Sequence, residues 1–304
     1  MPYGASDPRS ALTSSKPAAI VDRYSGMGYA ELSELPAVAE PAGRRDWFVR
    51  GQNFVLGWSI VSGTTDFGPR TDAEEHVVIS VDPGIALTVE AGSERQEIPG
   101  ERLVVLPPGK SRVIATGEGR VVRLMRSTSD DVAGLAINAA DYSTAHHNIP
   151  AFEGWPAPVG GFRIRAYDLT VPTRPDSPFR LYRCTTFMVN WIAPQEGPRD
   201  PRMLSPHHHD DFEQCSLVIN GEYVHHIRWP WTTDSSAWRE DEHHRTVAPS
   251  VAIIPPPSEH TSEAVGAGTN QLVDIFSPPR LDFSSMDGWV LNSADYPMPA
   301  RNDA

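Results

Sequence analysis

The sequence has little cysteine, no long apolar run and no basic leader. Its 304 residues include only Cys184 and Cys215. Two thiols 31 positions apart form neither a disulfide framework nor a CxxC metal motif, so both are expected to be small buried residues. No stretch approaches the roughly 18 consecutive apolar residues of a membrane-spanning helix, and the N-terminus lacks a basic segment followed by an apolar one. We therefore expect a cytoplasmic protein with no membrane partner.

Positive charge is also scarce. The chain has 26 lysines and arginines against 39 aspartates and glutamates, which gives a formal net charge of −13. Proteins that bind nucleic acids neutralise phosphates with lysine and arginine, and anionic membrane surfaces attract the same residues. A nucleic-acid partner and an anionic membrane surface are therefore both disfavoured.

Proline, in contrast, is abundant. There are 29 prolines in 304 residues, about twice the usual share of roughly 5%. Proline lacks a backbone N–H and clashes inside a helix, so this composition argues against a helical bundle. With 39% hydrophobic and 21% charged residues, the chain still has the composition of a folded protein.

Short apolar segments rich in β-branched residues dominate the chain from Asp46 onward, and each ends at Gly, Pro, Asp or Asn. These apolar segments are absent from a Pro- and Gly-containing stretch at about 127–176 and reappear after it. Such spacing is typical of antiparallel barrels and sandwiches. We expect an irregular N-terminal arm over residues 1–45, one β domain over 46–160 and a second over 161–304.

The two β-rich halves resemble each other. The segment RLVVLPPGKSR matches SVAIIPPPSEH after a shift of 148 positions, which pairs Arg112 with His260. Upstream, TDAEEHVVI matches DDFEQCSLVI after a shift of 139 positions, which pairs Asp72 with Asp211. Internal similarity of this kind indicates a repeat, so we predict two β domains of similar topology in tandem.

Histidine is concentrated in the second half, where eight of the 11 histidines lie between residues 207 and 260. His207 and His209 are two positions apart, so on a strand their side chains point to the same face. Glu213 follows shortly after, and His260 follows a Pro-rich turn. Three imidazoles and a carboxylate form a ligand set that suits Fe(II), Mn(II), Ni(II), Cu(II) or Zn(II). The pattern predicts one divalent metal ion per chain, with His207, His209, Glu213 and His260 as ligands.

These residues resemble the two motifs of the cupin superfamily, small β-barrels whose first motif reads G-x5-H-x-H-x3or4-E-x6-G and whose second reads G-x5-P-x-G-x2-H-x3-N. His207-x-His209-x3-Glu213 matches the core of the first motif, and Pro255-x-Pro257-x2-His260 matches the second with Pro257 in place of Gly. The resemblance implies an all-β fold of two tandem cupin barrels.

The identity of the fourth ligand stays open. Glu213 is followed by seven residues before Gly221, where the motif has six, whereas Gln214 has the six-residue spacing. A carboxylate is the better ligand for a divalent cation, so we favour Glu213 as ligand or catalytic base. If Gln214 takes the place instead, the site is closer to a three-histidine centre, which the family also contains.

The first half departs from the motifs. Its counterpart of the second motif, Pro107-x-Gly109-x2-Arg112, has Arg112 in the place of the histidine, and no H-x-H precedes it. A guanidinium stays protonated and cannot bind a cation. The N-terminal barrel is therefore predicted to lack metal ligands.

In the cupin family, three-histidine and three-histidine-one-glutamate iron sites carry out dioxygenation that opens rings or cleaves C–C bonds. The resemblance thus implies an Fe(II)-dependent dioxygenase acting on a small aromatic or dicarbonyl acid. An isomerase or lyase acting on a sugar acid, and a non-catalytic bicupin that binds a small ligand, are the alternatives, because one fold hosts unrelated activities. Two-barrel cupins often dimerise, and the Trp-rich stretch at 228–245 favours a homodimer.

Overall fold

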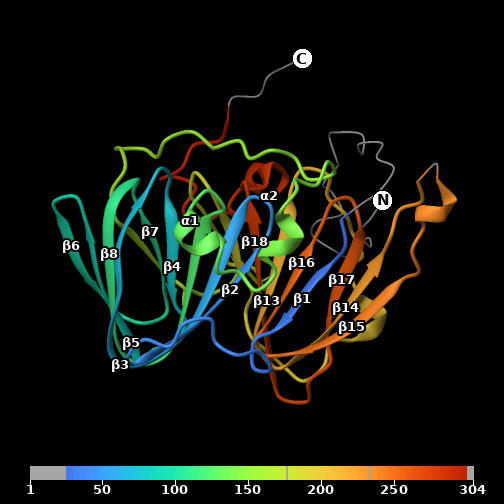
Figure 1. Cartoon of the computed structure of the whole chain (residues 1–304), viewed down its shortest axis with the longest axis horizontal. Helices are drawn as coiled ribbons and strands as arrows, with labels where there is room; N and C mark the ends of the chain where they lie inside the picture. Colours follow the sequence, from blue (N-terminus) through green and yellow to red (C-terminus); the bar gives the residue numbers. More distant parts are fainter. Residues whose placement is uncertain (1–24, 176, 233, 300–304) are drawn as a thin grey trace.

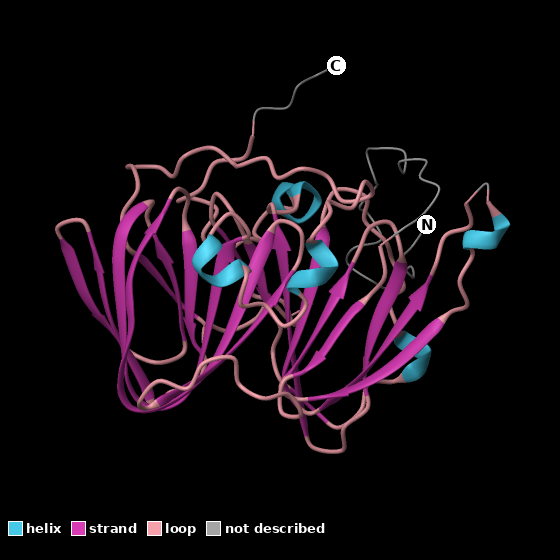
Figure 2. Cartoon of the chain, in the orientation of Figure 1, coloured by secondary structure: helices cyan, strands magenta, loops and turns pink. Residues whose placement is uncertain are grey.

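Strands are the main regular elements of the computed structural model, which describes residues 25–175, 177–232 and 234–299. The helices are short (Figure 2): α1 covers Asp130–Ala133 and α2 covers Leu281–Ser285. Within those described ranges, no helix is long and apolar enough to cross a membrane. The prediction of an all-β fold is confirmed, and both cysteines are buried free thiols as expected.

Most of the N-terminal half forms one antiparallel sheet. Its strands are β2 (Arg44–Arg50), β3 (Phe54–Asp72), β4 (His76–Ser80), β5 (Ile85–Ala91), β6 (Glu94–Ile98), β7 (Arg102–Leu106), β8 (Gly109–Arg126) and β9 (Arg165–Asp168). They pair in the order β2-β3-β8-β4-β7-β9, while β5 pairs with β6 and β8. In β5, the buried residues Ile85, Leu87 and Val89 alternate with more exposed ones. This two-residue period directs one face of the strand into the core.

The C-terminal half forms two further sheets. Their strands are β1 (Gly28–Glu31), β10 (Leu181–Arg183), β11 (Met188–Trp191), β12 (Gln195–Glu196), β13 (Glu213–Asn220), β14 (Glu222–Arg228), β15 (Glu242–Val247), β16 (Ser250–Ile254), β17 (Glu259–Ala264) and β18 (Thr269–Ser277). One sheet has the order β1-β16-β13-β18-β11-β10 with β12 beside β18, and the other has the order β15-β14-β17.

Two strands cross the predicted domain boundaries. β1 lies within the segment expected to be an irregular arm, yet it pairs with β16, and Gly28 faces Ile253. In Figure 1 this blue strand lies among the orange and red strands of the C-terminal half. β9 lies beyond residue 160 but pairs with β7 of the N-terminal sheet. Each strand covers an otherwise open sheet edge, which explains why the sheets do not follow the boundaries at 45 and 160.

A shared hydrophobic core joins the halves. One cluster of buried side chains combines Leu56 and Leu124 from the N-terminal sheet with Leu217 and Val273 from the C-terminal sheet. In Figure 1 the two halves stand side by side with β2 and β13 near their junction. Because apolar burial is the main favourable contribution to folding, the packing of the two halves is part of the stability of each.

Strand pairing sets the correspondence between the halves. In the N-terminal sheet His76 of β4 faces Leu106 of β7, and in the C-terminal sheet Gln214 of β13 faces Ile254 of β16. Leu106 and Ile254 are 148 positions apart, which agrees with the predicted shift. His76 and Gln214 are 138 positions apart, so the predicted shift of 139 in this strand is wrong by one residue.

The shared core leads to a prediction about unfolding. Leu217→Ala removes a fully buried side chain from the cluster that both halves share, so it should lower the free energy of unfolding by about 2–5 kcal/mol. Urea denaturation followed by tryptophan fluorescence should show one cooperative transition at lower urea. Leu135→Ala, at a position that is 47% exposed, is the control and should shift the transition little. Two separate transitions, only one of them shifted, would contradict a shared core.

Candidate metal centre

Three predicted ligands converge in the C-terminal half. One nitrogen from each of His207, His209 and His260 lies within 4.8 Å of the others, and all three side chains are buried. The backbones of His207 and His260 exchange two hydrogen bonds, of 3.0 and 2.8 Å, which tie the segment before β13 to β17. Among the described residues no other three His, Cys, Asp or Glu side chains converge in this way. The structure thus brings together residues that are 53 positions apart in sequence.

Hydrogen bonds to backbone carbonyls set the tautomers of two of these histidines. His207 Nδ1 lies 2.8 Å from the carbonyl oxygen of Ser205, and His260 Nδ1 lies 3.0 Å from that of Ser258. A carbonyl only accepts, so both Nδ1 atoms are donors, and in the neutral ring the lone pair is on Nε2. An imidazole that donates one N–H to a carbonyl and offers its other nitrogen is the usual arrangement of a metal ligand.

His209 is the third imidazole, and it is neutral. Burial holds the pKa of His209 well below its usual value, and the neighbouring His260 and Arg280 lower the pKa further. Neutral imidazole is the form that binds metal.

Gln214 supplies the fourth polar atom of the site. Its Oε1 lies 3.0 Å from His209 Nε2 and 3.3 Å from His260 Nε2. Its Nε2 donates to Asp274 Oδ1 and Ser216 Oγ, each at 2.9 Å. Because the Asp274 carboxylate only accepts, these bonds fix the amide with its oxygen toward the imidazoles.

Glu213, which the sequence favoured as ligand or catalytic base, does not lie with the three histidines. Successive residues on a strand point to opposite faces, and Glu213 lies on the face of β13 away from the three histidines. Its carboxylate accepts hydrogen bonds from the Gln52 backbone N–H at 2.6 Å and from the Tyr142 hydroxyl at 2.9 Å. Burial raises the pKa of the Glu213 carboxyl to about 7. The spacing to Gly221, which pointed to Gln214, was the better guide.

The polar atoms at this position fit a divalent cation. His260 Nε2 carries a lone pair when Nδ1 donates, yet it faces Gln214 Oε1, which is also an acceptor. Acceptors directed at one another are stabilised by a cation between them. Three nitrogens and one neutral oxygen suit Mn(II), Fe(II), Ni(II), Cu(II) or Zn(II), and this donor set does not select among them.

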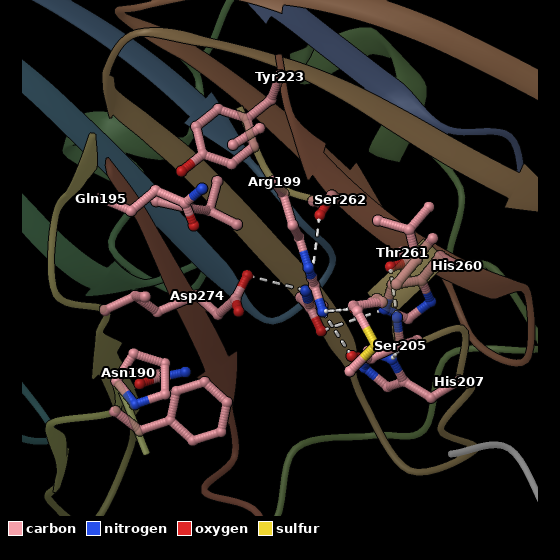
Figure 3. Close-up of a pocket in the computed structure, with 18 of the residues that line it drawn as sticks. Asn190, Gln195, Arg199, Ser205, His207, Tyr223, His260, Thr261, Ser262 and Asp274 are labelled. Carbon is pink, nitrogen blue, oxygen red and sulfur yellow. Dashed lines mark hydrogen bonds between the residues drawn. The ribbon is translucent and has the colours of Figure 1, made fainter. Parts of the chain in front are cut away.

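A cavity of about 400 Å³ opens beside His207, His260 and Gln214. Its lining residues include Asn190, Gln195, Arg199, Tyr223, Asp274 and Arg280, and Figure 3 labels the first five of them. None of these six was predicted, because they lie outside the motifs, on β11, β12, β14 and β18 and on loops next to β12 and α2, and only the folding of the chain brings them together. A cavity of this size accommodates a small molecule.

The N-terminal half has different residues at the equivalent positions. His76 corresponds to Gln214, and Pro69, Thr71 and Arg112 correspond to His207, His209 and His260, since Pro69 pairs with Arg112 as His207 does with His260. The Arg112 guanidinium donates to the Asp66 carboxylate. Only one imidazole is therefore present in this set, in line with the departure from the motifs seen in the sequence.

No family model and no curated protein matches the sequence. Several solved structures do match. AerE from Microcystis aeruginosa shares 9% identity with a TM-score of 0.53, over 85% of this chain and all of that chain. A variant of oxalate decarboxylase from Bacillus subtilis shares 14% identity with a TM-score of 0.56, over 84% of this chain and 78% of that chain. A structure from work on the Mn(II) centres of the same enzyme shares 13% identity with a TM-score of 0.54 over the same shares. Identities this low show the fold alone, and the fold is that of cupin proteins, as the motifs predicted.

The assignment of ligands is tested with neighbouring histidines. His209→Ala removes one of the three converging imidazoles, so the purified protein should lose most of the divalent metal that the wild type binds. His208→Ala is the matched control, because His208 lines a separate surface cavity beside Trp231 and should leave metal content unchanged. Elemental analysis after purification with added Mn(II) or Fe(II) measures both. Full metal content in the His209 variant would refute the assignment.

His76 makes folding sensitive to acid. Burial lowers the pKa of His76 to about 4, against an unfolded value of about 6.5. The unfolded state therefore binds more protons, and stability falls as the pH drops from about 6.5 toward 4. Replacing His76 by Gln, the residue at the equivalent position of β13, should reduce the loss between pH 7 and pH 5 by about 2 kcal/mol. Urea titrations at both pH values measure the free energy of unfolding. An equal loss of stability in the wild type and in H76Q would show that His76 is not the cause.

Proposed function

The chain has the cupin fold, and on that basis we propose that it is a metal-dependent enzyme acting on a small organic acid. The observation that carries this proposal is the convergence of three imidazoles and the Gln214 amide oxygen beside a cavity of about 400 Å³, which His207, His260 and Gln214 line. His207, His209 and His260 would hold the metal, with Gln214 as a fourth donor. Once bound, a divalent metal supplies Lewis acidity and a template for a chelating substrate.

Three arginines, Arg199, Arg202 and Arg280, line the cavity against one carboxylate, Asp274, and this excess of positive charge favours an anionic substrate. In Figure 3 the Arg199 side chain extends toward Ser205, next to His207. Arg199 donates to Ser205 Oγ at 2.8 Å, which holds the guanidinium near the histidines. Arginine is well suited to carboxylates because its planar group can donate two parallel hydrogen bonds. An acid bound through its carboxylate would therefore be oriented toward the three imidazoles.

Asn190 offers a further contact. Its side chain is 2% exposed and lines the cavity, and within the described part of the chain its Oδ1 has no hydrogen-bond partner. Buried polar atoms are nearly always paired, so an unpaired acceptor at a cavity wall suits a hydroxyl or amine of a ligand. We assign Asn190 a role in orienting the substrate.

Within this proposal we favour iron and dioxygenation. The support is the resemblance of the three converging histidines to the three-histidine iron centres of the cupin family. The rival is metal-assisted isomerisation or elimination in the same cavity, which consumes no oxygen.

Oxygen consumption separates these reactions. Iron-loaded protein with a panel of aromatic and 1,3-dicarbonyl acids should consume oxygen in proportion to the acid lost. H260A should lose at least about 100-fold in rate, since a ligand is removed. His208→Ala should retain the rate, because it leaves the ligand set intact.

Two outcomes go against this proposal. Conversion of an acid without oxygen uptake would replace dioxygenation by isomerisation or elimination. A metal-loaded protein that converts none of the acids would argue for a binding protein instead.

A further inference from the structure

Two buried carboxylates occupy equivalent positions in the two halves, and each is held by the other half. Glu213 begins β13 and Glu75 directly precedes β4. Since His76 corresponds to Gln214, Glu75 corresponds to Glu213. Both side chains are at most 1% exposed.

The donors to Glu213 come from the N-terminal half. Its Oε2 accepts the backbone N–H of Gln52, in the loop between β2 and β3, and its Oε1 accepts the hydroxyl of Tyr142 beyond β8. Gly51 makes this close approach possible, because a Cβ at that position would lie 2.5 Å from the Phe54 ring and 2.7 Å from Glu213 Oε2. A larger residue at 51 would displace the loop or these side chains.

The donors to Glu75 come from the C-terminal half. Its Oε2 accepts the backbone N–H and the hydroxyl of Thr185, in the loop between β10 and β11, at 2.9 and 2.8 Å. Its Oε1 accepts the hydroxyl of Tyr296, beyond α2, at 3.0 Å. Each half thus contributes a buried carboxylate, a loop N–H and a tyrosine to a pair of reciprocal contacts.

The two contacts differ in what lies next to them. Gln214 follows Glu213 and contacts His209 and His260, whereas His76 follows Glu75 in a half that has no second imidazole at the equivalent positions. The segment bearing His207 and His209 lies outside the regular strands. It is fixed at one end by the backbone bonds between His207 and His260 and at the other by the start of β13 at Glu213.

We propose that Glu213 is a positioning residue through which the N-terminal half holds the metal centre of the C-terminal half in its binding geometry. The contacts with Gln52 and Tyr142 fix the first residue of β13, and this places the Gln214 oxygen and the His209 ring. The inference rests on the proposed metal centre. It also gives a structural role to the N-terminal half, which lacks the three histidines.

Metal affinity of the full chain tests this, with Glu75 as the matched control. Competition between the protein and a chelator for Mn(II) or Zn(II) gives the affinity, and thermal denaturation gives the stability. Glu213→Ala and Glu75→Ala each leave a buried N–H and a tyrosine hydroxyl without their acceptor, so both should lower the melting temperature. Only Glu213→Ala should weaken metal binding, by about 10- to 100-fold, as loss of residues that orient ligands typically does.

A second substitution distinguishes the effect of the hydrogen bonds of Glu213 on metal binding from the effect of its charge. In Glu213→Gln the amide oxygen can accept from the Gln52 N–H and the amide nitrogen can donate to the Tyr142 oxygen, so the contacts remain while the charge is lost. This variant should bind metal nearly as tightly as the wild type. If either alanine variant fails to fold, Tyr142→Phe and Tyr296→Phe form a milder pair, in which only Tyr142→Phe should weaken metal binding.

Three results would overturn the inference: unchanged metal affinity in Glu213→Ala, an equal loss in the Glu75 and Glu213 variants, or a failure of Gln to restore binding. The last would show that the carboxylate acts through its charge. Failure of the proposed function looks different, because the wild-type protein itself would then bind no metal.

Discussion

The site depends on the fixed orientation of one amide. Asp274 and Ser216 accept both hydrogens of the Gln214 side chain, so its oxygen must face His209 and His260. Backbone carbonyls fix His260 and His207 in the same way. Lone pairs from several groups are thus directed at one small volume, and this convergence is what makes a cation there favourable.

The two halves depend on one another. Apolar side chains from both sheets form one core, β1 completes the sheet of the opposite half, and the carboxylates of Glu75 and Glu213 exchange contacts across the junction. These connections give the N-terminal half a structural task although its ligand positions hold Pro69, Thr71 and Arg112. A repeat in which one copy carries the converging histidines and the other supports it structurally is consistent with the motifs of both halves.

Much of the fold and the three histidines could be predicted, because strand periodicity and ligand spacing are local. Between Glu213 and Gln214, the spacing to Gly221 pointed to Gln214, but the preference for a carboxylate ligand favoured Glu213. The difference matters because a shift of one residue moves a side chain to the opposite face of a strand. β1 is four residues long and its partner strand lies more than 200 positions away, so no local sequence pattern predicts it. Arg199, Arg280 and Asn190 reach the cavity only through the packing of distant strands. The expected homodimer and cytoplasmic location stay predictions.

The most direct measurement is a crystal structure of the protein after exposure to Mn(II), with an anomalous difference map recorded to locate the metal. The account predicts one strong peak between the side chains of His207, His209 and His260, beside the Gln214 oxygen and away from the Glu213 carboxylate. A map with no peak at this position, or with the metal bound to Glu213, would contradict it.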